Sequence, residues 1–254
     1  MRRVRPTVIA AVALACLLPA VAVSASVVQT EEEKVHRVVP MNPNGTLKLR
    51  NFSGTVTITG ASVQEVTIDA VRRATRDRLD RIKLDIRSEG STVIVEANKK
   101  DPAAENLNNN VVETDFEIQV PRDARLDVDV FSSPVTVTGV GGRLDVKTFS
   151  GTLRLRDVAS PSTTKTFSGG IELELAGHVT QPELDLETFS GAIELQMPGG
   201  AGASVELDTF NGAIKSEIPL SVRSQSRREL KGDIGQPGSG RLRLKTFSGG
   251  VTIR

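Results

Sequence analysis

The sequence predicts an all-β protein, a β-solenoid of stacked 18–22-residue repeats, and three observations point to it. Seven of the eight phenylalanines stand in one recurring motif, Thr-Phe-Ser-Gly or a close variant. On both sides of this motif apolar and polar residues alternate with a period of two, which is typical of half-buried strands. From Phe131 onward the motif recurs every 18–22 residues, apart from one longer interval before Phe247. Repeats of this length typically stack into elongated folds.

The phenylalanines of the motif are the residues that the sequence singles out as structural. They are Phe52, Phe131, Phe149, Phe167, Phe189, Phe210 and Phe247. Counting from each Phe, positions −5 and −3 are apolar in most copies, as are positions +4 and +6. In the unit around Phe149 these are Leu144, Val146, Leu153 and Leu155.

Two folds accommodate this pattern. In a hairpin-built β-sandwich, Ser-Gly forms a two-residue loop, and each Phe points away from the apolar face beside the turn. In the solenoid, the motif is a bend between strands of different sheets, and each ring turns inward and stacks on the next. We favour the solenoid, because seven exposed rings would be a liability and burying one ring stabilises a fold by roughly 1.5–3 kcal/mol.

Residues 1–25 have the features of a secretory signal peptide. A basic start at Arg2, Arg3 and Arg5 precedes an apolar run, and Ala25 ends the small-residue site at which we expect cleavage. An uncleaved membrane anchor is one alternative. A lipoprotein anchored through Cys16 is another, although the apolar run continues past that cysteine. With the signal removed, no segment approaches the ~20 apolar residues of a membrane span, so we expect an exported protein of the periplasm or cell surface.

The remainder divides into three parts. Residues 26–34 are polar and are expected to form a disordered leader. Residues 35–110 carry irregular strand signals, with a charged loop or short helix at 72–81. Residues 111–254 form the regular array, which a loop insertion at 221–240 interrupts.

Composition excludes several functions. Basic and acidic residues nearly balance, 32 against 31, and only 3% of residues are aromatic, so no nucleic-acid partner is expected. The single cysteine, Cys16, lies in the signal peptide, which leaves the mature chain without disulfides. His36 and His178 lack partners at metal-ligand spacing, so we predict neither a metal site nor a cofactor.

Two groups of charged residues have weaker functional interpretations. Stacking would place Asp127 beside Asp145, the best candidates for a glycan-active enzyme or a calcium site, but a solvated outer face explains them more simply. Similarly, the basic residues of the 221–240 insertion could touch an acidic glycan or lipid headgroups, but an ordinary solvated loop accounts for them; they are Arg223, Arg227, Arg228 and Lys231. We therefore predict no catalytic residues.

The segments Phe116–Ala124 and Lys231–Gly235, together with the Phe-Ser-Gly repeats, resemble the DUF4097 family of β-strand-repeat proteins, which are also labelled adhesins. The resemblance covers roughly residues 35–254. It implies a bacterial envelope protein with a solenoid-like fold and no established catalytic residues.

The expected function is accordingly that of an exported, non-catalytic, adhesin-like or structural protein of the bacterial cell envelope. Its partner is unknown, with an envelope or cell-surface glycan or protein as candidates. A glycan-active enzyme remains an alternative. A component of envelope-stress signalling, to which some relatives are linked, is another.

Overall fold

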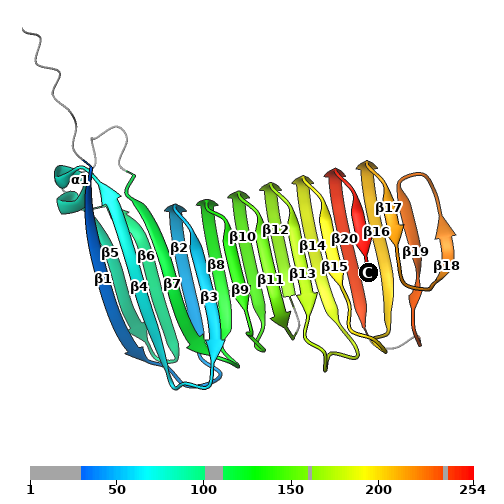
Figure 1. The fold of residues 1–254 in the computed structure, drawn as a ribbon, viewed down its shortest axis with the longest axis horizontal. Coiled ribbons are helices and arrows are strands. Elements are labelled where there is room, and N and C mark those ends of the chain that lie inside the picture. Colours follow the sequence, from blue (N-terminus) through cyan, green and yellow to red (C-terminus); the bar gives the residue numbers. More distant parts are fainter. Residues whose placement is uncertain (1–29, 101–110, 160–161, 237–239) are drawn as a thin grey trace, which may run out of the picture.

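The computed structural model describes residues 30–100, 111–159, 162–236 and 240–254, which form two large sheets (Figure 1). The ten-stranded sheet has the order β1 (Glu31–Pro40), β4 (Glu65–Ala74), β7 (Glu113–Pro121), β3 (Val56–Ala61), β9 (Val135–Thr138), β11 (Leu153–Val158), β13 (Ile171–Leu175), β15 (Ile193–Gln196), β21 (Val251–Ile253), β17 (Ile214–Ser216). The eleven-stranded sheet has the order β18 (Leu220–Gln225), β19 (Glu229–Ile234), β16 (Ala203–Asn211), β20 (Arg241–Ser248), β14 (Glu183–Ser190), β12 (Ser162–Ser168), β10 (Leu144–Ser150), β8 (Arg125–Ser132), β2 (Thr46–Ser53), β6 (Thr92–Lys100), β5 (Ile82–Glu89). The prediction of an all-β fold is confirmed.

Each motif joins a strand of the eleven-stranded sheet to a strand of the ten-stranded sheet. Strand β10, for example, runs through Phe149, and β11 begins after the bend in the opposite sheet. Neighbouring units pair in parallel and in register, so that Leu144 lies beside both Leu126 and Ser162. A hairpin at the motif would instead have paired the two flanking strands with each other. The motif is therefore a bend between the two sheets.

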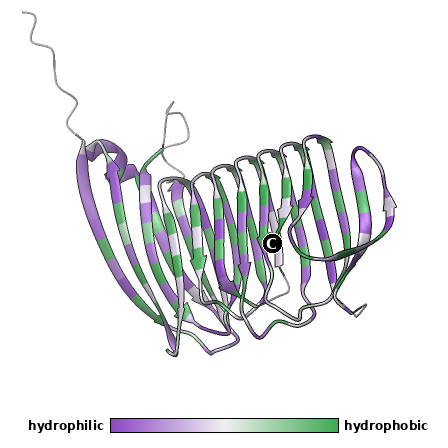
Figure 2. Ribbon diagram, turned by 45° about the vertical axis from the view of Figure 1, so that its right-hand side comes forward, coloured by the Kyte–Doolittle hydropathy of each residue, from purple (hydrophilic) through white to green (hydrophobic). Residues whose placement is uncertain are grey.

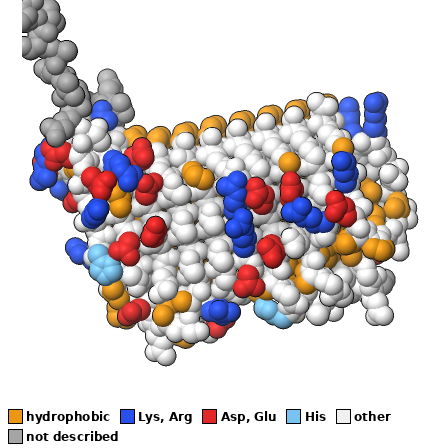
Figure 3. All heavy atoms as spheres, viewed as in Figure 1, with side chains coloured by type: hydrophobic (Ala, Val, Ile, Leu, Met, Phe, Trp, Pro, Cys, Tyr) orange, Lys and Arg blue, Asp and Glu red, His pale blue; other side chains and the backbone are white. Residues whose placement is uncertain are grey.

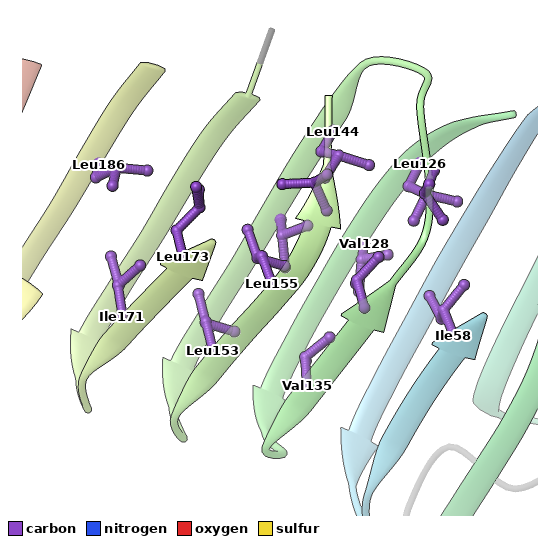
Figure 4. Close-up of a cluster of buried hydrophobic side chains, with 14 of the residues drawn as sticks. Ile58, Leu126, Val128, Val135, Leu144, Leu153, Leu155, Ile171, Leu173 and Leu186 are labelled. Carbon is purple, nitrogen blue, oxygen red and sulfur yellow. The ribbon is translucent and has the colours of Figure 1, made fainter. Parts of the chain in front are cut away.

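The core fills the space between the two sheets. Leu144, Val146, Leu153 and Leu155 have no exposed surface, and Asp145 and Arg154, which alternate with them, are half-buried. Figure 4 shows such side chains pointing toward one another from the two sheets, and Figure 2 shows the alternation of hydrophobic and hydrophilic residues along the strands. The apolar positions −5, −3, +4 and +6 thus form one continuous interior.

The last unit of the chain does not lie at the end of the array. Strand β20 pairs in parallel with β14 on one side and with β16 on the other, and β21 lies between β15 and β17. Its place in the sequence alone would suggest a terminal coil, but in the structure it has a neighbouring unit on each side. Strand β19 pairs with the outer edge of β16 in antiparallel fashion, so that edge is occupied and the final unit sits on the inner one.

The structure also tests the predictions for three segments, the 221–240 insertion, the leader at 26–34 and the charged stretch at 72–81. The expected loop insertion at 221–240 contains an antiparallel hairpin of β18 and β19, because backbone pairing with β16 continues the sheet there. Within the leader predicted to be disordered, residues 31–34 belong instead to β1, where Glu33 forms an ion pair with the buried Arg72 of β4. The charged stretch at 72–81 contains the short helix α1, Arg76–Arg81, as one of its two interpretations stated.

The signal peptide at 1–25, its cleavage site and Cys16 lie outside the described residues. Among the residues that the structure does describe, no helix is long and apolar enough to cross a membrane.

Candidate functional site

The seven motif phenylalanines form a ladder on the outside of the molecule, which we call the phenylalanine ladder. Their exposed fractions range from 41% at Phe52 to 51% at Phe210. The prediction that these rings are buried inside a corner is wrong. Each strand of the eleven-stranded sheet continues through its Phe, so the alternation that buries positions −5, −3 and −1 turns position 0 outward.

The predicted stacking of the rings is confirmed. Successive ring centroids are 4.7–4.9 Å apart, and neighbouring planes differ by 1–3°, or by 15° for Phe52 and Phe131. Figure 3 shows a row of hydrophobic side chains along the upper edge of the molecule. Because each inner ring is stacked on both sides, its faces are covered and its edge meets the solvent. The ladder is a straight apolar ridge rather than a set of separate aromatic platforms.

The threonine that precedes five of the seven phenylalanines explains why the ladder is straight; Asn51 and Val130 take its place before Phe52 and Phe131. The threonine side chain points inward, and its hydroxyl donates a hydrogen bond to a backbone carbonyl in the neighbouring unit's bend. Thr188 Oγ1 lies 2.9 Å from the carbonyl oxygen of Gly169, and Thr246 Oγ1 lies 3.0 Å from that of Gly191. These partly buried bonds hold adjacent bends in register. The sequence shows the recurring Thr, but its partner is visible only once the units are stacked.

A row of charged side chains runs beside the ladder on the same face, two residues before each Phe. In spatial order this charged row is Arg50, Asp129, Lys147, Lys165, Glu187, Lys245, Asp208. In the middle of the molecule a shallow groove separates the two rows, with Phe167, Phe189 and Phe247 on one side and Lys147, Lys165, Glu187 and Lys245 on the other. An apolar ridge therefore lies next to a row of mixed charges.

Electrostatics within the charged row follow from these neighbours. Lys165 Nζ lies 2.9 Å from Glu187 Oε2, and this bond lowers the pKa of Glu187 and raises that of Lys165. Burial, and then the nearby carboxylates of Glu206 and Glu229, raise the pKa of Asp208. At the end of the ladder the Arg228 guanidinium lies 4.1 Å from the ring centroid of Phe210, a cation–π contact that covers the ladder's last ring face.

The candidate acidic pair has the predicted position, since Asp127 and Asp145 are register neighbours on β8 and β10. Each carboxylate has its own cation: Arg50 donates to Asp127 at 3.0 and 3.3 Å, and Lys147 Nζ lies 3.2 Å from Asp145. This arrangement is that of a solvated, ion-paired sheet face.

The remaining candidates are scattered. His36 Nδ1 lies 2.6 Å from Asp69 at the surface, and His178 is exposed in a turn. Among the described residues no group of three or more His, Cys, Asp or Glu is arranged to hold a metal ion. Of the predicted basic stretch, Arg223 is paired with Asp233 and Lys231 with both Glu206 and Glu229, while Arg227 is exposed.

We expect Phe167→Ala to lower the free energy of unfolding by about 1–2.5 kcal/mol. The ring is about half-exposed, so its transfer contribution is reduced, but stacking on two neighbours adds to it. Chemical denaturation measures the change. A loss above about 4 kcal/mol is what a fully buried ring would give and would contradict the exposed ladder.

No family model matches the chain, and no curated protein matches it. Solved structures that resemble it include a putative cell adhesion protein from Clostridium sporogenes ATCC 15579, with 12% identity, 88% of this chain and 99% of that chain covered, and a TM-score of 0.48. A putative adhesin from Bacteroides fragilis NCTC 9343 has 12% identity, coverages of 87% and 97%, and a TM-score of 0.35. A putative lipid binding protein from Parabacteroides distasonis ATCC 8503 has 8% identity, coverages of 87% and 96%, and a TM-score of 0.27.

Proposed function

We propose that the chain is a β-solenoid that acts as an exported, non-catalytic, adhesin-like module of the bacterial cell envelope, and that the phenylalanine ladder is its contact surface. One observation carries the proposal: seven rings form a single straight ridge of apolar edges exposed to solvent. Support for export comes from the leader sequence, and support for an envelope role from the resemblance to the DUF4097 family.

The size of the ridge supports a contact function. Phenylalanine side chains present about 150–250 Å² each, so seven rings that are 41–51% exposed offer roughly 600 Å² of apolar surface. This area reaches the upper end of the largest apolar patch on a typical monomer, and such patches mark interaction sites. Scattered surface phenylalanines would need no such explanation, but a continuous row does.

Ring orientation narrows the kind of partner. Sugars are bound by stacking on an exposed aromatic face, and here the inner ring faces are covered by neighbouring rings at 4.7–4.9 Å. Ring edges instead suit another apolar surface, packed by van der Waals contact. We therefore propose an apolar protein or lipid surface, rather than the ring of a glycan, as the class of partner for the ladder.

The test is the retention of envelope vesicles from the producing bacterium on a surface coated with the chain. We expect the triple variant Phe149→Ser, Phe167→Ser, Phe189→Ser to reduce retention about fivefold or more, because it interrupts the middle of the ridge.

The matched control changes outward residues of the same three coils in the ten-stranded sheet, Arg154→Ser, Glu172→Ser and Glu194→Ser. This variant should retain vesicles within about twofold of the unchanged chain, since surface changes away from the contact have small effects. If the two triple variants behave alike while both remain folded by circular dichroism, the ladder is not the contact surface.

A further inference from the structure

The charges beside the ladder indicate what the ridge contacts. We propose that its partner is a second copy of this chain, bound ladder to ladder in the opposite direction about a two-fold axis through the central rung, Phe167. This inference rests on the proposed function, because it takes the ladder to be the contact surface.

The symmetry of the ladder allows such a pair. Phe167 has three rings on either side, in the order Phe52, Phe131, Phe149 and then Phe189, Phe247, Phe210. A two-fold axis that crosses the ladder at right angles at Phe167, in the plane between the two copies, therefore brings every rung of one copy to a rung of the other. Two-fold contacts of this kind are the commonest among homo-oligomers, because one self-complementary patch is sufficient.

The charged row is self-complementary under this reversal. Arg50 on the first rung meets Asp208 on the last rung of the other copy. Asp129 on the second rung meets Lys245 on the sixth, and Lys147 on the third meets Glu187 on the fifth. Six of the seven rungs thus face an opposite charge. Only the central rung meets its like, Lys165, and each Lys165 already has Glu187 of its own copy at 2.9 Å.

The same row argues against the main alternative occupant, a lipid surface. An anionic membrane attracts a patch of one sign, whereas this row mixes signs, with Arg50 and Asp129 as neighbours and Lys245 between Glu187 and Asp208. In a row of mixed charges, attraction to and repulsion from a surface of one sign largely cancel. They do specify register and direction between two protein surfaces.

Straightness and area also fit a second copy. The six inter-ring steps make a ridge roughly 29 Å long, and because most neighbouring planes differ by only 1–3°, two ridges can stay in contact along their whole length. Roughly 600 Å² of apolar surface per copy approaches the ~800 Å² per partner of a standard interface, and the charged rows supply the rim. We expect a reversible dimer with a dissociation constant on the order of 1–100 µM.

The experiment is sedimentation velocity of the full chain over a range of concentrations, with a charge swap between Asp129 and Lys245. Within one copy these residues are four rungs apart, roughly 19 Å, so neither can compensate for the other there. Each single variant, Asp129→Lys or Lys245→Glu, places two like-charge contacts in the dimer and should weaken it about 5- to 20-fold. The double variant restores both contacts and should return the dissociation constant to within about threefold of the unchanged chain.

A thermal melt of each variant at a concentration where it is monomeric separates misfolding from lost association. The inference is overturned if the unchanged chain stays monomeric throughout, or if the double variant is as weak as the two single effects combined. Either result leaves the proposed function standing when the phenylalanine triple variant still loses vesicle retention. If the unchanged chain never dimerises and the phenylalanine triple variant still loses vesicle retention, the ridge contacts a different envelope partner.

Discussion

Deleting residues 241–254 should unfold the C-terminal units of the array while leaving the N-terminal units folded. Strand β20 contacts β14 and β16 on its two sides, so its removal breaks two parallel ladders at once. The segment also carries Leu242, Leu244, Val251 and Ile253, none of which has any exposed surface. Burial of four such side chains contributes roughly 6–12 kcal/mol, which is comparable to the 5–15 kcal/mol that stabilises a whole domain.

Hydrogen exchange is the measurement. In the truncated chain the amides of β14, β16 and β17 should lose protection, whereas those of β2, β3 and β8 should keep it, because each unit of a repeat protein contacts only its neighbours. A synthetic peptide of residues 240–254, added to the truncated chain, should restore protection in β14 and β16 by completing both ladders. The prediction fails if truncation leaves exchange unchanged, which would mean that β16 closes directly onto β14.

The strands and their inward faces could be predicted from the sequence, because they depend on local alternation. Leu144 and Val146 before Phe149, and Leu153 and Leu155 after it, have no exposed surface, as the period of two required. The alternation alone did not distinguish a hairpin at the motif from a bend between sheets. The parallel register of neighbouring units, which only the structure shows, identifies the motif as a bend.

The direction of the rings was predicted wrongly because an energetic argument outweighed a geometric one. Parity along the strand places Phe149 opposite in direction to Thr148, and the structure follows parity. The energetic argument assumed that a ring outside the core is fully exposed. Stacking at 4.7–4.9 Å covers both faces of each inner ring, so the exposure is nearer half. Stacking thereby removes from solvent much of the ring surface that the energetic argument assigned to the core.

The order of the units could not be read from the sequence. Strands β14, β16 and β20 all carry two inward apolar residues followed by an inward threonine, so each could pair with either of the others. Their order depends on β19, which occupies the outer edge of β16. Its sequence, with Gly232 in the middle and charged residues around it, has weak strand signals, and this long-range pairing leaves no local trace.

The motif glycine makes the second large prediction, since it allows neighbouring bends to approach closely. A Cβ on Gly169 would lie 2.1 Å from the carbonyl oxygen of Gly151, and its φ of +151° is one that residues with a side chain rarely adopt. The same bend also holds two bonds to the next unit: the Gly169 amide donates to the Ser190 carbonyl at 2.9 Å, and the Gly169 carbonyl accepts from Thr188. Gly169→Ala should therefore lower the free energy of unfolding by about 3 kcal/mol or more.

Gly177→Ala is the matched control, because a Cβ at that position would have no atom within 4 Å and the φ of Gly177 is not positive. It should change stability by less than about 0.5 kcal/mol in the same denaturation experiment. Because Phe167 and Phe189 flank the bend at Gly169, separation of these two units would also interrupt the ridge at its centre. Gly169→Ala should then weaken self-association as well as stability. If Gly169→Ala proves as stable as Gly177→Ala, the bends can accommodate a Cβ and the straightness of the ladder has another origin.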